Sequence, residues 1–271
     1  MSIIKKQEEI KYILEGGKLL GEILEKLADL VEPGISTWKI DVEAEKMIKA
    51  VGGRPAFKNY RSSRDDIPFP GTICASINEE VVHGIPKKDR FLKEGDIFSI
   101  DIGMQYPVNS GLGKGGNGFF TDTALTIAVG KINEETKKLL DATKNSLEKV
   151  ISEIKIGDSI SDIGKTIENY IQPFGYGIVR DLVGHGVGHE VHEEPSVPNY
   201  YEPSLNAWKI TPGVVLAVEP MITLGNYRVD VSKDGWSFST VDKSLSAHFE
   251  HTLVFTEKGL IVATRRPKEL K

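Results

Sequence analysis

The sequence predicts an α+β protein made of two similar halves, and three observations support this class. The N-terminus carries two amphipathic stretches, residues 54–130 carry short β-like runs broken by Gly and Pro, and the same helix-then-strand order returns after Asn133. The second half therefore starts near Asn133. A chain of 271 residues is compatible with one large domain, so we expect residues 1–271 to form a single domain.

Helices are expected where apolar residues recur at three- and four-residue steps. This pattern predicts helices over residues 3–31, 37–51, 134–153 and 160–173. Pro33-Gly34 ends the first helix, and the second begins near Ser36. Asn133 caps the third, with acids in the first turn where the helix dipole favours them, and the fourth ends near Pro173.

Strands are expected where β-branched and aromatic residues form short runs between turn residues. The clearest runs are residues 73–82, 97–102, 121–129, 178–183, 214–218 and 249–255. The Gly-rich residues 109–118 predict a flexible loop between two of these strands. A phosphate-binding loop would need Ser or Thr after Lys114, and Gly115 stands there instead, which argues against a nucleotide site.

Composition narrows the class of protein further. A net charge of -5 gives no sign of the basic surface that nucleic-acid binding needs. We find no apolar run of about 18 residues that could span a membrane, and the charged N-terminus gives no sign of a signal peptide. The single cysteine, Cys74, excludes an internal disulfide and a zinc site built on several cysteines. We therefore expect a cytoplasmic protein in a reducing compartment.

The most informative oddity is the placement of acids within or at the ends of apolar runs. Asp101, Asp122, Glu219 and Glu250 each lie in or beside a strong β-like run, although Asp and Glu are poor or middling strand formers. Each could simply point outward from a half-solvated strand. A buried carboxylate must instead be paired with a cation or bind a metal, and no Lys or Arg lies within these runs.

The histidines favour the metal alternative. The chain has six histidines, and a lone histidine is more often structural than a ligand. His185, however, lies between two glycines in Gly184-His185-Gly186, which allows close backbone approach in a tightly built site. One histidine with several carboxylates suits divalent Mn, Fe or Co, and an acid-rich set can bridge two ions about 3.5–4 Å apart.

Six segments follow one another in a fixed order along nearly the whole chain. They are Ser76-Ile77-Asn78-Glu79 with His83-Gly84-Ile85-Pro86, Ile100-Asp101-Ile102-Gly103, Gly184-His185-Gly186-Val187-Gly188, His192-Glu193-Glu194-Pro195, Glu219-Pro220 and Ser246-Ala247-His248-Phe249-Glu250-His251-Thr252. Each segment alone is a weak signal, but the ordered set is specific. It resembles the type I methionine aminopeptidases of the M24 metallopeptidase family.

The resemblance implies a fold and a metal centre. The fold is the pita-bread fold, in which two pseudo-symmetric α+β halves surround a curved antiparallel sheet. The centre would hold two divalent metal ions, Co, Mn or Fe with Zn also possible. Its ligands would be Asp101, Asp122, His185, Glu219 and Glu250.

The resemblance also implies an activity, which is removal of the initiator methionine when the second residue is small. Glu219 would shuttle the proton, and His83 and His192 would hydrogen-bond the scissile peptide. Phe69, Cys74 and Trp236 match the apolar lining of the methionine pocket. The partners would be the N-termini of nascent polypeptides near the ribosome. The protein would be a monomer and would bind neither nucleic acid nor a membrane.

The sequence departs from the family pattern in two places. Asp101 and Asp122 are farther apart than the family's aspartates because of the Gly-rich stretch. We hypothesise that residues 107–119 form an extended loop near the mouth of the site, and a mobile surface hairpin is the equal alternative. Val191 stands where the family often has an aromatic residue before the histidine, which leaves the shape of the pocket open.

Other functions remain to be weighed against this one. Prolidases and proline aminopeptidases of the same fold usually carry an extra N-terminal domain, and His83 comes too early in the chain to leave room for one. Type II methionine aminopeptidases carry an insert between the last two glutamate ligands, but Glu219 and Glu250 are close in sequence. A non-enzymatic binding protein on this fold would lack some of the ligands, and all five ligand residues are present.

Overall fold

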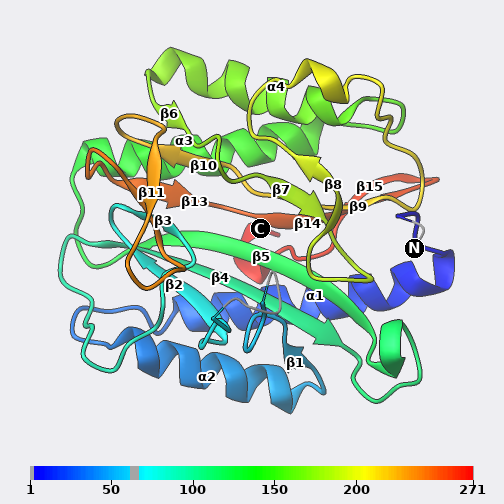
Figure 1. The fold of residues 1–271 in the computed structure, drawn as a ribbon, viewed down its shortest axis with the longest axis horizontal. Coiled ribbons are helices and arrows are strands. Elements are labelled where there is room, and N and C mark those ends of the chain that lie inside the picture. Colours follow the sequence, from blue (N-terminus) through cyan, green and yellow to red (C-terminus); the bar gives the residue numbers. More distant parts are fainter. Residues whose placement is uncertain (1–2, 62–66, 271) are drawn as a thin grey trace.

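The computed structural model describes residues 3–61 and 67–270. Met1 and Ser2 lie outside the described residues. They begin the N-terminal segment that gave no sign of a signal peptide. Four main helices enclose the strands in two pairs (Figure 1). The helices are α1 (Gln7–Ala28), α2 (Thr37–Ala50), α3 (Glu134–Glu153) and α4 (Ile160–Ile171). Helices α1 and α2 lie on one side of the strands, α3 and α4 lie on the other, and the α+β prediction is confirmed.

Side-chain caps set the start of three of these helices. Ser36 Oγ accepts from the amide of Lys39 (3.3 Å) at the start of α2, and Asn133 Oδ1 accepts from the amide of Thr136 (2.7 Å) at the start of α3. Ser159 begins α4 in a capping box with Asp162. The first helix ends at Ala28, a few residues before the predicted end, because the chain tightens there into turns.

The first half contributes an antiparallel sheet built around one long strand. Its strands are β1 (Arg54–Pro55), β2 (Ile73–Ile77), β4 (Ile97–Tyr106) and β5 (Phe119–Ala128), and β3 (Glu80–Val82) pairs elsewhere. Strand β4 pairs with β2 and β1 along one edge and with β5 along the other. The predicted strand 73–82 is two strands, because Asn78 adopts a left-handed conformation (φ 57°) and turns the chain.

The second half contributes a five-stranded antiparallel sheet in the order β15-β14-β9-β7-β8. These strands are β7 (Gly184–Gly186), β8 (Glu193–Val197), β9 (Val215–Val218), β14 (His251–Thr256) and β15 (Gly259–Val262). Smaller sheets with the orders β13-β10-β6 and β11-β12-β3 use β6 (Gly177–Ile178), β10 (Met221–Thr223), β11 (Val229–Val231), β12 (Phe238–Thr240) and β13 (Ser246–His248).

Two predicted strands of the second half differ from the structure. The run 178–183 is a strand only at its first residue, and Arg180 then stacks over the rings of Tyr200 and Tyr227 instead of continuing the ladder. The run 249–255 begins later, at His251, because Glu250 bonds through its backbone to Ala124 of β5. Short 3-10 turns lie at Lys114–Gly116, Gln172–Phe174, Pro203–Leu205 and Pro267–Glu269.

Each helix pair buries its own apolar cluster against the strands. One cluster joins α1 and α2 to β2 and β4, and it includes Leu24, Ile40 and Ile100. The other joins α3 and α4 to β9 and β14, and it includes Leu147, Ile163 and Leu253. The two helix pairs are thereby held to the middle layer independently, and both halves contribute strands to that layer.

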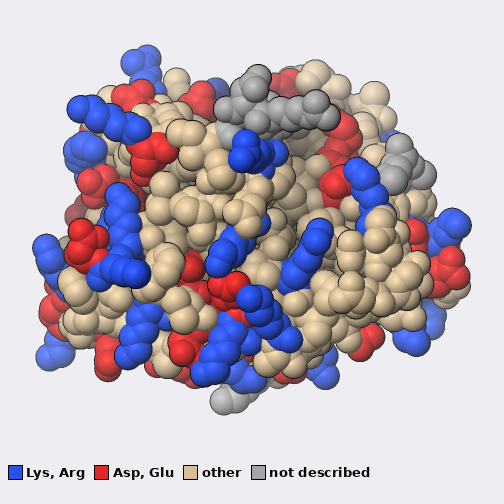
Figure 2. Space-filling model, turned by 60° about the horizontal axis from the view of Figure 1, so that its bottom comes forward, with Lys and Arg blue, Asp and Glu red and all other residues tan. Residues whose placement is uncertain are grey.

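The surface carries both signs of charge. On the face shown in Figure 2, Lys and Arg side chains are mixed with Asp and Glu side chains. None of the helices in the described part of the chain has the length and apolar composition needed to cross a membrane.

Candidate functional site

The two aspartates lie on neighbouring strands of the first-half sheet. Asp101 on β4 pairs with Ala124 on β5, and Asp122 lies two residues before Ala124 on the same strand. Side chains two apart on a strand share a face, so the two carboxylates lie diagonally on one face of the sheet. The intervening Gly-rich stretch is simply the connection between two long strands, and it leaves this register intact.

His185 and Glu219 repeat this diagonal arrangement in the second half. His185 on β7 pairs with Ala217 on β9, and Glu219 follows Ala217 by two residues. The alternation of a strand again brings both side chains to one face. His185 Nε2 lies 3.6 Å from Glu219 Oε1, while His185 Nδ1 lies 2.8 Å from the carbonyl of Gly186. The backbone carbonyl fixes Nδ1 as the donor and leaves Nε2 free to face the carboxylate.

Glu250 lies where the two halves meet. Its amide donates to the carbonyl of Ala124 (2.9 Å), the same residue that pairs with Asp101. The next residue, His251, pairs with Val218 of β9, immediately before Glu219. One short segment thus connects the strand pair of the aspartates with the strand pair of His185 and Glu219.

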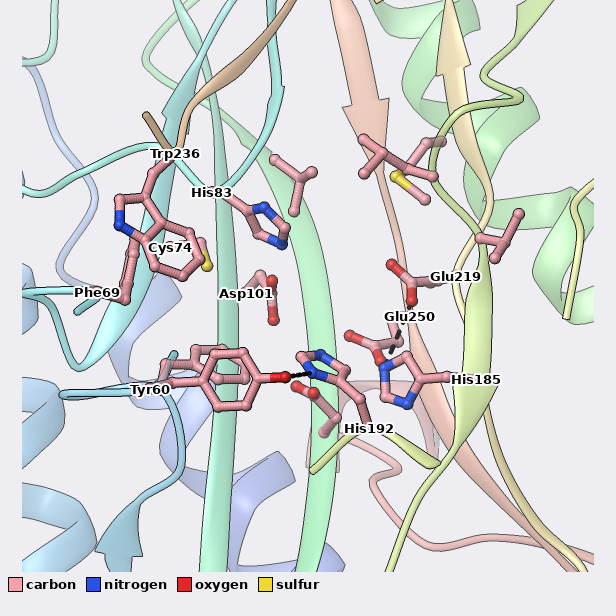
Figure 3. A pocket seen from close by; sticks show the side chains of 16 residues that line it. Tyr60, Phe69, Cys74, His83, Asp101, His185, His192, Glu219, Trp236 and Glu250 are labelled. Carbon is pink, nitrogen blue, oxygen red and sulfur yellow. Dashed lines mark hydrogen bonds and ion pairs between the residues drawn. The ribbon is translucent and has the colours of Figure 1, made fainter. Parts of the chain in front are cut away.

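The five predicted ligands therefore come together in space (Figure 3). Asp101, Asp122 and Glu250 form one group of ligand-type atoms that all lie within 4.8 Å of one another, and His185, Glu219 and Glu250 form a second group by the same measure. Glu250 belongs to both groups. Its carboxylate is the shared member that a pair of neighbouring ions would need.

These carboxylates are buried, and no Lys or Arg among the described residues lines the pocket around them. The exposed fraction of Asp101, Asp122 and Glu250 is 7%, 2% and 2%, and none of the residues that line the pocket is Lys or Arg. Burial raises the pKa of Asp101 to about 6. Burial and the neighbouring Asp101 carboxylate raise the pKa of Asp122 well above its ordinary value, and burial and Asp122 do the same to Glu250.

The donor set fits divalent cations. It consists of carboxylate oxygens and one imidazole nitrogen, the ligands that Mn, Fe, Co and Zn accept. Within the described residues, the buried Oδ1 of Asp101 has no hydrogen-bond partner. A bound cation would satisfy this oxygen and would neutralise the mutual repulsion of the acids.

Glu219 differs from the other three acids. Burial acts to raise its pKa, but the imidazoles of His248, His185 and His192 together lower the pKa below its ordinary value. His248 Nε2 lies 3.2 Å from Glu219 Oε2. Glu219 is thus the acid of this site that is most readily ionised, and it has a histidine on each side.

A pocket contains the acids and extends beyond them. It has a volume of about 150 Å³ and is lined by the five candidate ligands as well as by apolar side chains, whereas small-molecule pockets typically measure roughly 300–1,000 Å³. Phe69, Cys74 and Trp236 line it, as the resemblance implied, and the rings of Phe69 and Trp236 meet edge to face with centroids 5.3 Å apart. Val191 packs beside Phe69 and Cys74 without lining the cavity.

His83 and His192 approach this pocket from opposite halves of the molecule (Figure 3). Burial lowers the pKa of His83 to about 4, so its imidazole is neutral at neutral pH. The ring of His192 meets the ring of His185 edge to face, with centroids 4.5 Å apart. Tyr60 reaches across from the first half, and its hydroxyl lies 2.9 Å from His192 Nδ1.

Several features of the site were missed or left open by the sequence. Tyr60 was not predicted, because nothing in the local pattern shows that its ring meets a residue more than a hundred positions away. His248 could have been found, because it is the last residue of β13 and lies two residues before Glu250. None of residues 109–118 of the Gly-rich loop lines the pocket, and Lys114 of this loop forms an ion pair with Glu190.

The remaining histidines lie outside the site. His189 Nε2 contacts Glu9 Oε1 of the first helix (3.2 Å). His251 follows Glu250 but points to the opposite side, where its Nδ1 lies 3.0 Å from Thr264 Oγ1. Strand alternation separates the two neighbours, and only Glu250 faces the acids.

Comparisons with known proteins agree with this geometry. The model of metallopeptidase family M24 matches residues 11–257. A methionine aminopeptidase of Clostridium acetobutylicum is 43% identical over 264 residues, which cover 97% of this chain and 99% of the relative. The crystal structure of methionine aminopeptidase from Thermotoga maritima superposes with a TM-score of 0.88 at 37% identity, covering 97% of this chain and 99% of that one.

A more distant structure shares the fold alone. The prolidase of Pyrococcus horikoshii superposes with a TM-score of 0.74 at 23% identity, and the match covers 99% of this chain but 65% of the prolidase. The predicted pita-bread fold is confirmed by these neighbours together.

Proposed function

Because this chain belongs to metallopeptidase family M24, we propose that its buried acids and His185 hold two divalent cations beside a methionine pocket. The chain is a metallo-aminopeptidase that removes N-terminal methionine from peptides and proteins. The observation that carries the proposal is the meeting of two ligand groups at the shared carboxylate of Glu250. When bound, such cations activate water and polarise the scissile carbonyl.

The residues of the chain have separate roles in this proposal. Asp101 would hold one ion, His185 and Glu219 would hold the other, and Asp122 and Glu250 would contribute to both. Co, Mn or Fe are the favoured ions, and Zn is also compatible with the donors. Glu219 would accept the proton of the attacking water and pass it to the leaving amine, a role that its ready ionisation supports.

The two outer histidines would act on the substrate's peptide group. The neutral imidazole of His83 can donate one hydrogen bond to the carbonyl oxygen as negative charge develops there. His192 can donate from Nε2 when Nδ1 accepts from the hydroxyl of Tyr60. The two rings thus orient the bond between the first two residues of the substrate.

Substrate choice would follow from the size of the cavity. Phe69, Cys74 and Trp236 form an apolar part of the pocket, which would receive an unbranched apolar side chain such as methionine. A small second residue would be favoured, because a wide side chain would collide with the histidines. We propose nascent polypeptides near the ribosome as the partners of a monomeric, cytoplasmic enzyme.

The decisive experiment couples metal content with methionine release. Purified protein is stripped of metal, reloaded with Mn, Fe or Co, and assayed on Met-Ala-Ser and on Met-Trp-Ser. We expect two ions per chain, release of methionine from Met-Ala-Ser, and much slower release from Met-Trp-Ser. Inactivity with every metal, despite normal folding, would favour a binding protein built on this fold.

A further inference from the structure

The loop that carries His192 is held from outside the site by the N-terminus of the chain. This loop connects β7 to β8 and spans residues 187–192. Three ionic contacts reach it from distant parts of the sequence, namely Lys5 with Glu193, Glu9 with His189, and Lys114 with Glu190. Glu193, the first residue of β8, directly follows His192.

Among these contacts the Lys5–Glu193 pair is the most buried. The Lys5 side chain is 1% exposed and that of Glu193 is 12% exposed, whereas Lys114 and Glu190 are 58% and 40% exposed. Exposed ion pairs contribute little, but a buried charge that loses its partner is strongly unfavourable. Lys5 is therefore bound to the carboxylate of Glu193 far more firmly than Lys114 is to Glu190.

The backbone leaves Lys5 little freedom. Its amide donates to the carbonyl of Gly213 (2.8 Å), and its ammonium group also donates to the carbonyl of Ile3 (3.0 Å). Its side chain lies directly over Gly188, where an added Cβ would come within 2.6 Å of Lys5 Cε. The Lys5 chain thus occupies the space beside the loop and fixes both the start and the end of it.

Chain connectivity links this contact to the active site. Glu193 is the first residue of β8 and is bonded directly to His192, which lies in the bend before that strand. Fixing the Glu193 side chain against Lys5 therefore restricts the backbone from which the His192 side chain reaches the pocket. Resting on the function proposed for His192, we infer that Lys5 is a positioning residue for catalysis. It orients the His192 imidazole through Glu193 and touches no substrate itself.

The test is a double-mutant cycle between Lys5→Met and His192→Ala, with kcat and KM measured on Met-Ala-Ser. We expect Lys5→Met to lower kcat/KM by about tenfold, because misplacing a catalytic group by about 1 Å can cost up to about 100-fold. In the His192→Ala background the same substitution should change kcat/KM less than twofold. Metal content should equal that of the unmodified enzyme. The matched control Lys6→Met, which removes an exposed neighbouring lysine, should leave kcat/KM unchanged.

The possible outcomes separate the inference from the function on which it rests. Equal losses for Lys5→Met in both backgrounds, or no loss in either, would overturn the positioning role. A His192→Ala enzyme with normal kcat/KM would instead overturn the role proposed for His192. Should Lys5→Met not fold, the double variant Lys5→Met/Glu193→Gln, which leaves no unpaired buried charge, goes through the same cycle with the same criteria.

Discussion

Two clusters in this molecule contain the same kinds of side chain and have opposite electrostatics. The first is the candidate metal centre described above, in which Asp101, Asp122 and Glu250 meet. The second, here called the C-terminal cluster, consists of Glu148, His251 and Glu269, whose ligand-type atoms also lie within 4.8 Å of one another. The two clusters are adjacent in sequence at Glu250 and His251, on opposite sides of the chain.

Arginine makes the difference between them. Arg265 forms a double contact with Glu148, and Arg266 donates to Glu269 Oε1 from Nη2 (2.7 Å). Although burial acts in the opposite direction, His251 and Arg266 lower the pKa of Glu269, and Arg265 lowers that of Glu148. In the candidate metal centre burial raises the pKa of Asp101 and Asp122, and no Lys or Arg lies among the described residues that line the pocket. A cluster of ligand-type side chains alone does not indicate a metal site. A buried cluster of acids that is not paired with Lys or Arg is the stronger indication.

The strongest test of this contrast neutralises one acid in each cluster. We expect Asp122→Asn to abolish metal binding and to lower kcat/KM on the order of 10⁴-fold, as does loss of one member of a catalytic unit. The metal-free Asp122→Asn protein should melt at a higher temperature than the metal-free parent, because it no longer carries a disfavoured buried charge. Glu269→Gln should do the reverse, keeping metal but losing stability. Metal analysis and thermal melting decide between these outcomes.

A second test removes the cation of the C-terminal cluster. Arg266→Met leaves Glu269 and its neighbours without their buried partner, and breaking such a pair costs roughly 3–5 kcal/mol. Arg266 is 5% exposed, so solvent compensates little. Urea unfolding should show this loss while metal content stays normal. Loss of metal with unchanged unfolding free energy would mean that the two clusters act as one.

The third test uses pH, because the two clusters should respond in opposite directions. Metal ligands must be deprotonated, and Asp101 has a pKa raised to about 6. Metal affinity should therefore fall as the pH is lowered, by about tenfold per pH unit for each proton that metal binding releases. Isothermal titration with Mn between pH 5 and pH 8 measures it, and an affinity independent of pH would contradict the shift.

In the metal-free protein, the free energy of unfolding should depend on pH with opposite signs for the two clusters. A raised acid pKa means that the folded state holds its proton more tightly, so Asp101 adds stability as pH falls through about 6 towards its ordinary value of 3.8. Glu269 has a lowered pKa, so its contribution is present above its ordinary value of 4.5 and is lost as pH falls further. Asp101→Asn should remove the first dependence, and Glu269→Gln the second.

An exposed ion pair gives the smallest expected effect and also tests the Gly-rich loop. Lys114→Ala removes the contact with Glu190, which should contribute less than about 1 kcal/mol because both side chains are largely solvated. The rate on Met-Ala-Ser should stay within twofold. A larger loss would support our hypothesis that residues 107–119 act near the mouth of the site, and an unchanged rate favours a surface hairpin.

The sequence predicted the helices well and singled out acids that the structure brings together, for identifiable reasons. Capping residues such as Asn133 and Ser36 mark helix starts directly, and the third helix begins and ends where predicted. The acids were noticeable because they interrupt strongly apolar strands. That five residues spread over about 150 positions meet at one place followed from a family resemblance, since no local pattern contains that information.

What was missed depends on contacts between distant residues. The run 178–183 has the composition of a strand, but Arg180 leaves the ladder to stack on two tyrosines. Tyr60 and Lys5 are ordinary residues in sequence, and their importance lies in partners more than a hundred residues away. Local propensity cannot show such partners, because they arise only when the two halves pack together.

The buried position of Cys74 has a practical consequence for studying this enzyme. It is the only cysteine of the chain and is 4% exposed, and burial together with Asp101 raises the pKa of its thiol well above the ordinary value. A thiol in that state reacts slowly with maleimides, which attack thiolates. A cysteine introduced on the surface would therefore take a fluorescent probe selectively, and the native residue need not be replaced first.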